Sequence, residues 1–256
     1  MHIKGNTFIV TGGGSGLGLS TAQELLKLGA NVVVIDVKDE GKSFFNEQDQ
    51  NFLFIQSDVT SEEGITKAIQ QTIEKFGENI RGVVNCGGIG RPGRIIGSDG
   101  KPLDYDSFKL TINVNLVGTF NVCRLVAAQI VKQKPLEGER GIIINVSSIA
   151  YQDGQVGQIS YAASKGGVSS MTIPMMRDLS RFGIRVVTIA PGIFDTPMGS
   201  SFKESIQRKL LNQIEYPARL GKPDGEFNKL VVHLIENTYI NGEIIRIDAG
   251  TRLGKL

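Results

Sequence analysis

The sequence predicts an α/β fold, a doubly wound, Rossmann-like sheet of seven parallel strands in a single domain spanning residues 1–256. Three observations predict it: short β-branched runs alternate with longer helical patterns, the strands read as continuous apolar runs, and no linker or internal repeat interrupts the chain. Continuous apolar strands are expected where helices cover both faces of a parallel sheet. The length also fits one domain, because α/β domains often reach roughly 250 residues.

The first half of the chain carries four predicted strands, each followed by a helix or a loop. Strands are predicted at 8–10, 32–35, 52–55 and 82–85, and helices over about 17–28, 40–47 and 62–76. The helix over 62–76 has the clearest pattern, because Ile65, Ile69, Ile73 and Phe76 recur at three- and four-residue spacing. This alternation indicates crossover connections between parallel strands.

The second half continues the alternation and adds two long irregular stretches. Helices are predicted over about 105–132, 159–182 and 223–236, and strands at 142–145, 185–189 and 243–247. The irregular stretches cover 87–104 and 191–207. Long loops in a compact domain are more often functional than idle. We therefore expect substrate-binding loops near 87–104 and 191–216.

Composition and charge exclude several classes of protein. The net charge is +2 and the charges are scattered, which argues against nucleic acid as a partner. Two cysteines give no disulfide framework, no apolar run approaches the roughly 18 residues of a membrane span, and His2 and His233 show no metal-binding pattern. The first strand begins so early that no leader is expected. These features favour a cytoplasmic protein, with the mitochondrial matrix as the alternative.

A glycine-rich segment, Thr11–Gly18, follows the first strand and opens the first helix. Glycines such as Gly12, Gly16 and Gly18 permit a tight turn and let backbone N–H groups approach phosphate oxygens at the helix N-terminus. The segment therefore predicts a dinucleotide site, with a plain glycine turn as the alternative.

Asp36 ends the second strand, about 18 residues after that motif. A carboxylate there can accept hydrogen bonds from ribose hydroxyls and would repel a 2′-phosphate, and Val37 and Lys38 follow instead of an arginine. NAD is therefore predicted over NADP, although Asp36 could also be a solvated strand-end residue. Asp58 and Val59 end the third strand, where they could meet an adenine ring. Asp58 could equally be a cap or turn residue.

Tyr161 and Lys165 are four residues apart on a predicted helix, so their side chains share one face. A nearby cation favours the phenolate and lowers the pKa of the tyrosine. The pair therefore predicts proton transfer near pH 7. A plain surface pair is the alternative.

Ser147 and Ser148 follow the fifth strand, at the sheet edge where ligands bind. With the glycine-rich segment, these residues predict hydride transfer between a carbinol or ketone and a nicotinamide.

Several motifs in one order resemble the short-chain dehydrogenase/reductase family over nearly the whole chain. They are Thr11–Gly18, Asp58, Asn85-Cys86-Gly87-Gly88, Asn115, Ser148, Tyr161 with Lys165, and Pro191-Gly192. The resemblance implies that Tyr161 is the acid/base and that Lys165 lowers its pKa and binds the nicotinamide ribose. It also implies that Ser148, at the family spacing of 13 residues before Tyr161, binds the substrate oxygen. Asn115 would hold a water in a proton relay, and Asn85 would brace the sheet.

Further segments, including 154–158, 188–192, 194–197 and 241–246, resemble the members of this family that act on 3-hydroxyacyl-CoA thioesters. That resemblance implies NAD, short acyl-CoA substrates, tolerance of steroids and a homotetramer. The residues expected at the cofactor are Gly12, Ser15, Gly16, Leu17, Gly18, Asp36, Asp58, Val59, Asn85, Cys86, Gly88, Tyr161, Lys165, Pro191, Phe194 and Thr196. The residues expected at the substrate are Ser148, Gln155, Gln158 and Tyr161.

Two departures from the family pattern stand out. Gly88 replaces the usual alanine of the Asn-x-Ala-Gly stretch, at position 87 or 88 depending on alignment, which is expected to loosen the adenine side. The end of the chain, 251–256, also differs from the usual one.

Other interpretations stay open. A 3-oxoacyl-carrier-protein reductase or a steroid dehydrogenase belongs to the same class, whereas a scaffold in an RNA-processing assembly belongs to another. Arg91, Arg94 and Lys101 could meet coenzyme A phosphates or be solvated loop charges. Met198, Phe202 and Ile214 could roof an acyl pocket or simply pack. The small residues of the helix over 159–182 favour a subunit contact.

Overall fold

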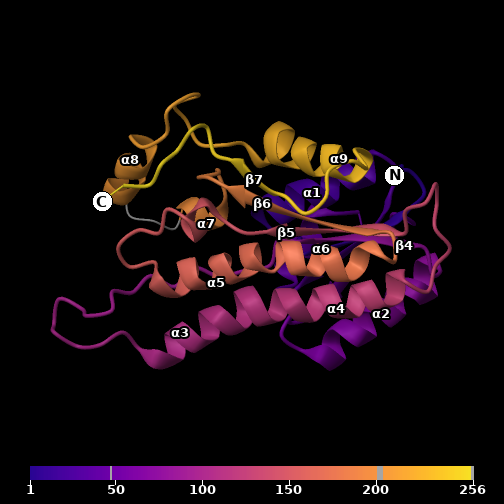
Figure 1. The fold of residues 1–256 in the computed structure, drawn as a ribbon, viewed down its shortest axis with the longest axis horizontal. Helices are drawn as coiled ribbons and strands as arrows, with labels where there is room; N and C mark the ends of the chain where they lie inside the picture. The colour runs from indigo at the N-terminus through magenta and orange to yellow at the C-terminus, as the bar shows by residue number, and fades with distance from the viewer. Residues whose placement is uncertain (47, 201–203, 255–256) are drawn as a thin grey trace.

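The computed structural model describes residues 1–46, 48–200 and 204–254, which form a three-layer α/β sandwich (Figure 1). Seven parallel strands make one sheet in the order β3-β2-β1-β4-β5-β6-β7. The strands are β1 Thr7–Thr11, β2 Asn31–Asp36, β3 Phe52–Gln56, β4 Ile80–Asn85, β5 Gly141–Val146, β6 Ile184–Pro191 and β7 Ile244–Ile247. This confirms the predicted fold class and places every predicted strand.

The strand order reverses beside β1, which pairs with β2 on one side and β4 on the other. In open parallel sheets a ligand-binding crevice forms at the carboxyl ends of the strands that flank such a reversal. The glycine-rich turn leaves β1 there, and Cys86 follows β4. The topology therefore brings the two predicted cofactor segments to one edge.

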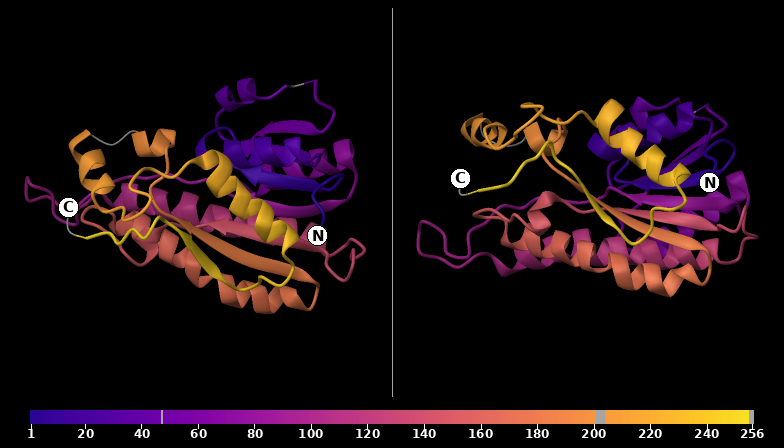
Figure 2. Two further views of the ribbon diagram at one scale, coloured as in Figure 1. Left: turned by 90° about the horizontal axis from the view of Figure 1, so that it is seen from above. Right: turned by 45° about the horizontal axis from the view of Figure 1, so that its top comes forward.

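Helices cover both faces of the sheet, as Figures 1 and 2 show. Helices α1 and α9 lie on one face and α2, α4, α5 and α6 on the other. The bounds are α1 Gly16–Lys27, η1 Glu40–Phe44, α2 Glu62–Phe76, α3 Tyr105–Ile112, η2 Asn113–Gly118, α4 Thr119–Ile130, η3 Ile149–Tyr151, α5 Ile159–Ser170, α6 Thr172–Ser180, α7 Pro197–Ser200, α8 Glu204–Leu211, η4 Pro223–Phe227 and α9 Asn228–Glu236.

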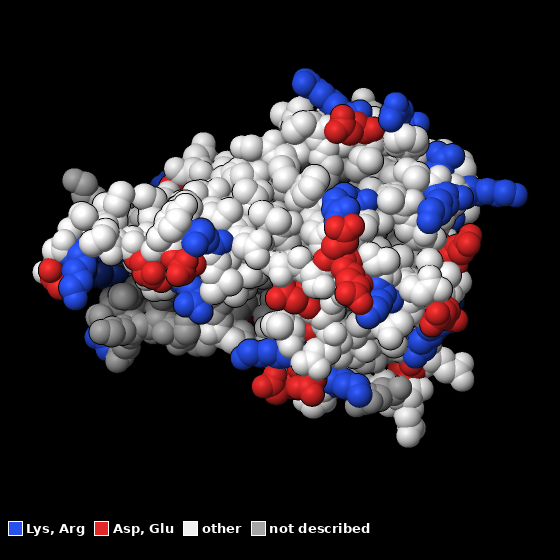
Figure 3. All heavy atoms as spheres, turned by 90° about the horizontal axis from the view of Figure 1, so that it is seen from below, with Lys and Arg blue, Asp and Glu red and all other residues white. Residues whose placement is uncertain are grey.

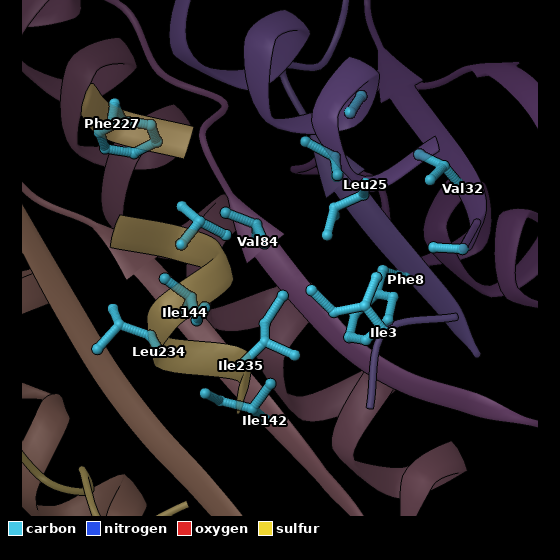
Figure 4. Close-up of a cluster of buried hydrophobic side chains, with 14 of the residues drawn as sticks. Ile3, Phe8, Leu25, Val32, Val84, Ile142, Ile144, Phe227, Leu234 and Ile235 are labelled. Atoms are coloured by element: carbon cyan, nitrogen blue, oxygen red, sulfur yellow. The ribbon is translucent and has the colours of Figure 1, made fainter. Parts of the chain in front are cut away.

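Each face of the sheet has its own hydrophobic core. In Figure 4, Leu25 of α1 and Leu234 and Ile235 of α9 lie over Phe8 and Ile144 of the central strands. A second cluster fills the opposite face, where α2 and α4 pack on the same strands. Burial on both faces explains why the strand sequences are apolar at consecutive positions.

Three helices differ from their predictions for local reasons. The helix expected over 159–182 is divided at Met171 into α5 and α6, and Pro174 in the first turn of α6 lacks the N–H that a continuous helix would use. The helix expected over 223–236 begins with a kink, because Asp224 and Gly225 have non-helical backbone angles. The helix near 40–47 is a short 3-10 turn, Glu40–Phe44, and Glu47 lies outside the described residues.

Helices α3, η2 and α4 form one continuous helical run, Tyr105–Ile130, whose most apolar 18-residue window has a mean hydropathy of 1.3. By length and composition alone it could cross a membrane, contrary to the expectation that no segment would be apolar enough. Half of its most apolar window is buried inside the fold, where α4 supplies Val122, Cys123 and Val126 to the core. These contacts make it a core helix of the sandwich.

Candidate active site

The turn between β1 and α1 requires glycine at two of its positions. Gly12 has φ +63°, and a Cβ there would lie 2.7 Å from the Cα of Gly87. A Cβ on Gly18 would overlap the carbonyl oxygen of Gly12. Without side chains, the turn leaves the N-terminal N–H groups of α1 open to an anion, which fits the pyrophosphate of a dinucleotide. Gly16, with φ +51°, lies against Thr196, and Ser15 is the exposed N-cap residue of α1.

Asp36 is fixed against this turn. Its Oδ2 accepts a hydrogen bond from the N–H of Gly14 at 3.0 Å, and its Oδ1 accepts one from Lys38 at 3.1 Å. A Cβ on Gly14 would lie 2.9 Å from the same Oδ2, so the carboxylate and the turn are in close contact. Asp36 is therefore part of the predicted nucleotide site and not a freely solvated side chain.

Asp58 is a turn residue, the alternative that the sequence left open. Its Oδ1 accepts hydrogen bonds from both the N–H and the hydroxyl of Thr60, each at 2.8 Å. Val59 lies nearer the site, because a Cβ on Gly87 would be 3.6 Å from its side chain. An adenine contact by either residue stays a prediction.

Asn85 is a brace inside the sheet, so its assignment as a cofactor contact is wrong. Its Nδ2 donates to the Oδ1 of Asn145 at 2.9 Å and to the Sγ of Cys123 at 3.3 Å, and its side chain is buried. It is the last residue of β4, between β1 and β5, and its side chain bonds within the sheet and does not line the cavity that holds Tyr161. The sheet-bracing role that the family resemblance implies is the one observed.

Gly88 lies beside the catalytic residues. A Cβ at this position would be 3.2 Å from Asn115 Oδ1 and 3.4 Å from Lys165 Nζ. The expectation that Gly88 loosens the adenine side is therefore wrong, since the space that it leaves adjoins the ammonium group. The neighbouring Cys86 thiol has its pKa raised to about 12 by burial, which makes it a packing residue and not a nucleophile.

A cavity of about 430 Å³ gathers most of the predicted residues at the carboxyl edge of the sheet. Its walls include Ser148, Tyr161, Lys165, Leu17, Cys86, Gly88, Pro191, Phe194, Thr196, Gln155 and Gln158. Most of the wall is apolar, and the polar groups are concentrated around Tyr161. A site of this kind holds a small molecule and orients it through a few hydrogen bonds.

The two serines after β5 have different roles. The Ser147 hydroxyl is buried, donates to the carbonyl oxygen of Lys165 at 2.8 Å and bonds the Ser169 hydroxyl at 2.8 Å. The Ser148 hydroxyl is half-exposed, accepts from the N–H of Ala150 at 3.2 Å and hydrogen-bonds Tyr161. Ser147 therefore docks α5 onto the sheet, whereas Ser148 faces the cavity beside the phenol, which supports choosing Ser148.

Burial controls the ionisation of Tyr161 and Lys165. Burial lowers the pKa of Lys165 to about 8, and it raises the pKa of Tyr161, while the hydrogen bond with Ser148 acts in the lowering direction. The Lys165 Nζ donates to the carbonyl oxygen of Val146 at 2.8 Å and lies 5.8 Å from the centroid of the Tyr161 ring. The expected lowering of the Tyr161 pKa by Lys165 is not found, since burial raises this pKa and the lowering contribution comes from Ser148.

Asn115 is fully buried in the π-helical turn η2 and joins three segments. Its Nδ2 donates to Ile89 O at 2.9 Å and to Ser164 Oγ at 3.0 Å, and its Oδ1 accepts from the N–H of Ile89 at 2.8 Å. Single π-turns inside α-helices occur often at functional sites. Because its amide is occupied, Asn115 holds the loop after β4 against α5. Its part in a water relay stays a prediction.

Gln155 and Gln158 line the cavity, but their amides bond to protein groups. Gln155 Nε2 donates to Gln213 Oε1 at 3.2 Å and to Gly254 O at 3.3 Å, and Gln158 Oε1 accepts from the N–H of Gln155 at 3.0 Å. These bonds hold the two side chains in the cavity wall, and a contact of either one with the substrate stays a prediction.

The loop after β6 covers the cavity. Phe194 is buried and packs edge-on against Phe227 with ring centroids 5.9 Å apart, which ties the loop to η4. Met198 lines the cavity and Ile214 is buried, whereas Phe202 lies outside the described residues.

Sequence reasoning missed several groups that build this site, and four of them matter for its shape. They are the Val146 carbonyl, the Ser164 hydroxyl, Leu210 and Leu253. Ser164 had a usable signal, since it immediately precedes Lys165 on the catalytic helix face. Leu210 and Leu253 carried none.

Comparison with known proteins agrees with this geometry. The family model for short chain dehydrogenases matches residues 6–207. The chain belongs to the short-chain dehydrogenase family. It is therefore an oxidoreductase, and the fit of the glycine turn and of Asp36 agrees with the nicotinamide cofactor of such enzymes. No group of three or more metal-ligating side chains occurs among the residues that the structure describes.

Named relatives cover almost the whole chain. The 3-hydroxyacyl-CoA dehydrogenase type-2 of Mus musculus is 44% identical over 98% of this chain and 97% of its own. A solved structure of 3-hydroxyacyl-CoA dehydrogenase type-2 from Mycobacterium avium is 42% identical, with a TM-score of 0.91 over 98% of this chain and 97% of that one. The 3-ketoacyl-(acyl-carrier-protein) reductase from Brucella melitensis, solved with NADH, is 26% identical, with a TM-score of 0.85 over 97% and 98% of the two chains.

Proposed function

We propose that the protein is an NAD-dependent dehydrogenase that interconverts the 3-hydroxyl and 3-keto groups of short or branched acyl-CoA thioesters. The observation that carries the proposal is the largely apolar cavity whose wall holds Ser148, Tyr161 and Lys165 together. An apolar cavity with the hydroxyls of Ser148 and Tyr161 in its wall suits an acyl chain that carries one hydroxyl group to be oxidised. The whole-chain likeness to enzymes with 3-hydroxyacyl-CoA dehydrogenase in their names supports the substrate class.

Each residue of the pair has a role in this reaction. Ser148 donates a hydrogen bond to the substrate oxygen, and Tyr161 removes the carbinol proton in oxidation or returns it in reduction. Lys165, held by Val146, keeps a positive charge beside the phenol and can bond a ribose hydroxyl. A bound nicotinamide supplies the hydride acceptor or donor.

Asp36 supports NAD over NADP. Its two oxygens are fixed by Gly14 and Lys38, so the carboxylate cannot swing away from a 2′-phosphate. Repulsion between a fixed carboxylate and a phosphate dianion lowers affinity for NADP.

The entrance of the cavity supports a coenzyme A thioester. Arg91 lines the cavity and is exposed, whereas Arg94 lies in the adjoining groove and Lys101 pairs with Asp99 at 3.8 Å. Arg91 and Arg94 are therefore placed to meet phosphate groups outside the chamber.

The test is turnover of 3-hydroxybutyryl-CoA with NAD and with NADP, followed by nicotinamide absorbance. We expect turnover with NAD, a lower kcat/KM with NADP, and a kcat lowered by about 10²–10⁴ in the matched variant Tyr161→Phe. If the folded protein oxidises a carrier-protein thioester or a steroid and ignores the acyl-CoA, the substrate class is wrong.

A homotetramer is the assembly that we propose. Large apolar side chains are exposed on α3, η2, α4, α5 and α6: Tyr105, Leu110, Val117, Phe120, Ile159 and Ile173. Figure 3, which views the molecule from the side of α2 to α4, shows charges of both signs beside a broad area without charges. Apolar area of this kind marks a protein contact. The face of α5 at Gly167 packs against Leu116 of the same subunit, since a Cβ at Gly167 would meet the Leu116 side chain. This small residue therefore serves packing within the subunit. Light scattering at micromolar concentration tests the tetramer, and a monomer would contradict it.

A further inference from the structure

The segment Thr251–Gly254, which follows β7, is bonded to the wall of the cavity. Thr251 is fully buried, and its carbonyl oxygen accepts a hydrogen bond from the guanidinium of Arg246 at 2.8 Å. Figures 1 and 2 show this end of the chain running beside α8, beyond the carboxyl ends of the strands. The segment is therefore an integral part of the fold around the site.

The first attachment is a partly buried ion pair. Arg246 Nη2 lies 2.7 Å from Asp153 Oδ2, and the two side chains are only 17% and 14% exposed. Arg246 holds the Asp153 pKa below its usual range, and the backbone of Leu253 acts in the same direction. Because the same Nη2 of Arg246 donates to Thr251 O, the pair fixes the start of the segment against the turn that follows Ser148.

The second attachment lies one residue further on. Gln155 Nε2 donates to Gly254 O at 3.3 Å and to Gln213 Oε1 at 3.2 Å, and Gly254 N donates to the same Gln213 Oε1 at 3.0 Å. These three bonds join the loop after η3, the residues after α8 and the segment after β7. Leu253 lies between the two attachments, so its backbone is held on both sides.

The side chain of Leu253 lines the cavity together with Leu210 of α8, which is buried. Leu17 and Cys86 line the part of the cavity at the glycine turn, whereas Leu210 and Leu253 belong to the segments beyond the strand ends. An apolar chain that starts at Tyr161 and extends away from the cofactor segments therefore runs towards these two leucines.

We propose that Leu253, held by the Arg246–Asp153 and Gln155–Gln213–Gly254 contacts, forms with Leu210 the end wall of the acyl channel and sets the longest acyl chain that the enzyme accepts. This inference rests on the proposed function, because it concerns the part of the site that binds the acyl chain and limits its length. A methylene that fits or fails to fit a rigid apolar wall changes specificity by about 10–200-fold.

The test compares kcat/KM for 3-hydroxybutyryl-CoA and 3-hydroxydecanoyl-CoA in the wild type, Leu253→Ala and Leu253→Phe. We expect Leu253→Ala to raise the long-to-short ratio by about tenfold or more, and Leu253→Phe to lower it. Leu211→Ala is the matched control, because Leu211 is an exposed neighbour in α8 and does not line the cavity. Its ratio should not change.

A gain of activity on the longer chain separates a wall residue from a residue that only stabilises the fold. Equal losses on both substrates in Leu253→Ala, with unchanged NADH affinity and circular dichroism, overturn the inference. Gln213→Ala, which removes two of the three bonds of the second attachment, should broaden the chain-length profile and raise KM while kcat is kept.

Failure of the proposed function is distinguishable from failure of this inference. If the wild type oxidises no acyl-CoA, the proposed function is wrong. The same variants are then compared on the ethyl esters of the two 3-hydroxy acids, where an unchanged ratio contradicts the wall and a raised ratio supports it.

Discussion

The ammonium group of Lys165 is bonded to the carbonyl oxygen of Val146, the last residue of β5, at 2.8 Å. The catalytic helix is thereby attached to the strand end through its charged residue. Because the ammonium group is also buried, its charged form is less favoured in the folded protein than in water, and its pKa falls to about 8. The charge that favours catalysis therefore costs stability.

Lys165→Met should stabilise the protein while abolishing turnover. Burial lowers the Lys165 pKa from 10.5 to about 8, so holding the charge at pH 7 costs about 3 kcal/mol, and losing the bond to Val146 offsets about 1 kcal/mol of the gain. We expect a net gain of about 1–2 kcal/mol in the free energy of unfolding, measured in urea at pH 7.

The pH dependence gives a second check on Lys165. Between about pH 8 and 10.5 the unfolded chain holds the Lys165 proton and the folded chain does not, so this group makes stability rise with pH in that window. The rise should be missing in Lys165→Met and present in Lys229→Met, a change at an exposed lysine of α9. A less stable Lys165→Met protein would contradict the prediction.

Tyr161→Phe should lower kcat by about 10²–10⁴ with little change in NADH affinity, because the ring and Lys165 remain. Burial raises the Tyr161 pKa, and oxidation needs the phenolate. The wild-type oxidation rate should therefore keep rising towards alkaline pH, and this limb should be absent in Tyr161→Phe. Steady-state rates between pH 6 and 10 check both expectations, and near-normal turnover in the folded variant would exclude Tyr161 as the base.

Asp36→Asn should narrow the preference for NAD over NADP by about tenfold. Asparagine keeps an oxygen for the Gly14 N–H and removes the charge that opposes a 2′-phosphate. The measurement is kcat/KM with each cofactor. Asp39→Asn, which changes an exposed carboxylate outside the turn, is the control. A wild-type protein that prefers NADP shows that Asp36 has been misinterpreted.

Gly18→Ala should weaken NADH binding by about tenfold or more and destabilise the fold by about 1–3 kcal/mol. The added methyl group would overlap the carbonyl oxygen of Gly12 and force the glycine turn to move. Gly166→Ala is the control, because its methyl group would lie 4.0 Å from Tyr151 O, an ordinary van der Waals contact. Fluorescence titration with NADH and thermal unfolding measure the two effects, and tight binding by Gly18→Ala would rule out this turn as the phosphate site.

The sequence predicts well those features that depend on neighbouring residues or on known motifs, namely the strands and the reacting groups. Apolar runs identify the strands, and the spacing of Ser148, Tyr161 and Lys165 identifies the reacting groups. It does not show how side chains are used by distant partners. Gln155 was expected at the substrate, and its amide is instead bonded to Gln213 and Gly254, which lie far along the chain. The direction of the Tyr161 pKa shift could not be predicted from the sequence either, because it depends on how deeply the folded protein buries the phenol.

The attachments of Thr251–Gly254 have a consequence for biosynthesis. The glycine turn, β1 to β6 and the Ser148–Tyr161–Lys165 group are all made before this segment leaves the ribosome. A nascent chain can therefore assemble a nucleotide pocket whose distal end is still open. If Leu253 closes the acyl channel as proposed, selection by chain length is completed only when Arg246 bonds Thr251 and Gln155 bonds Gly254.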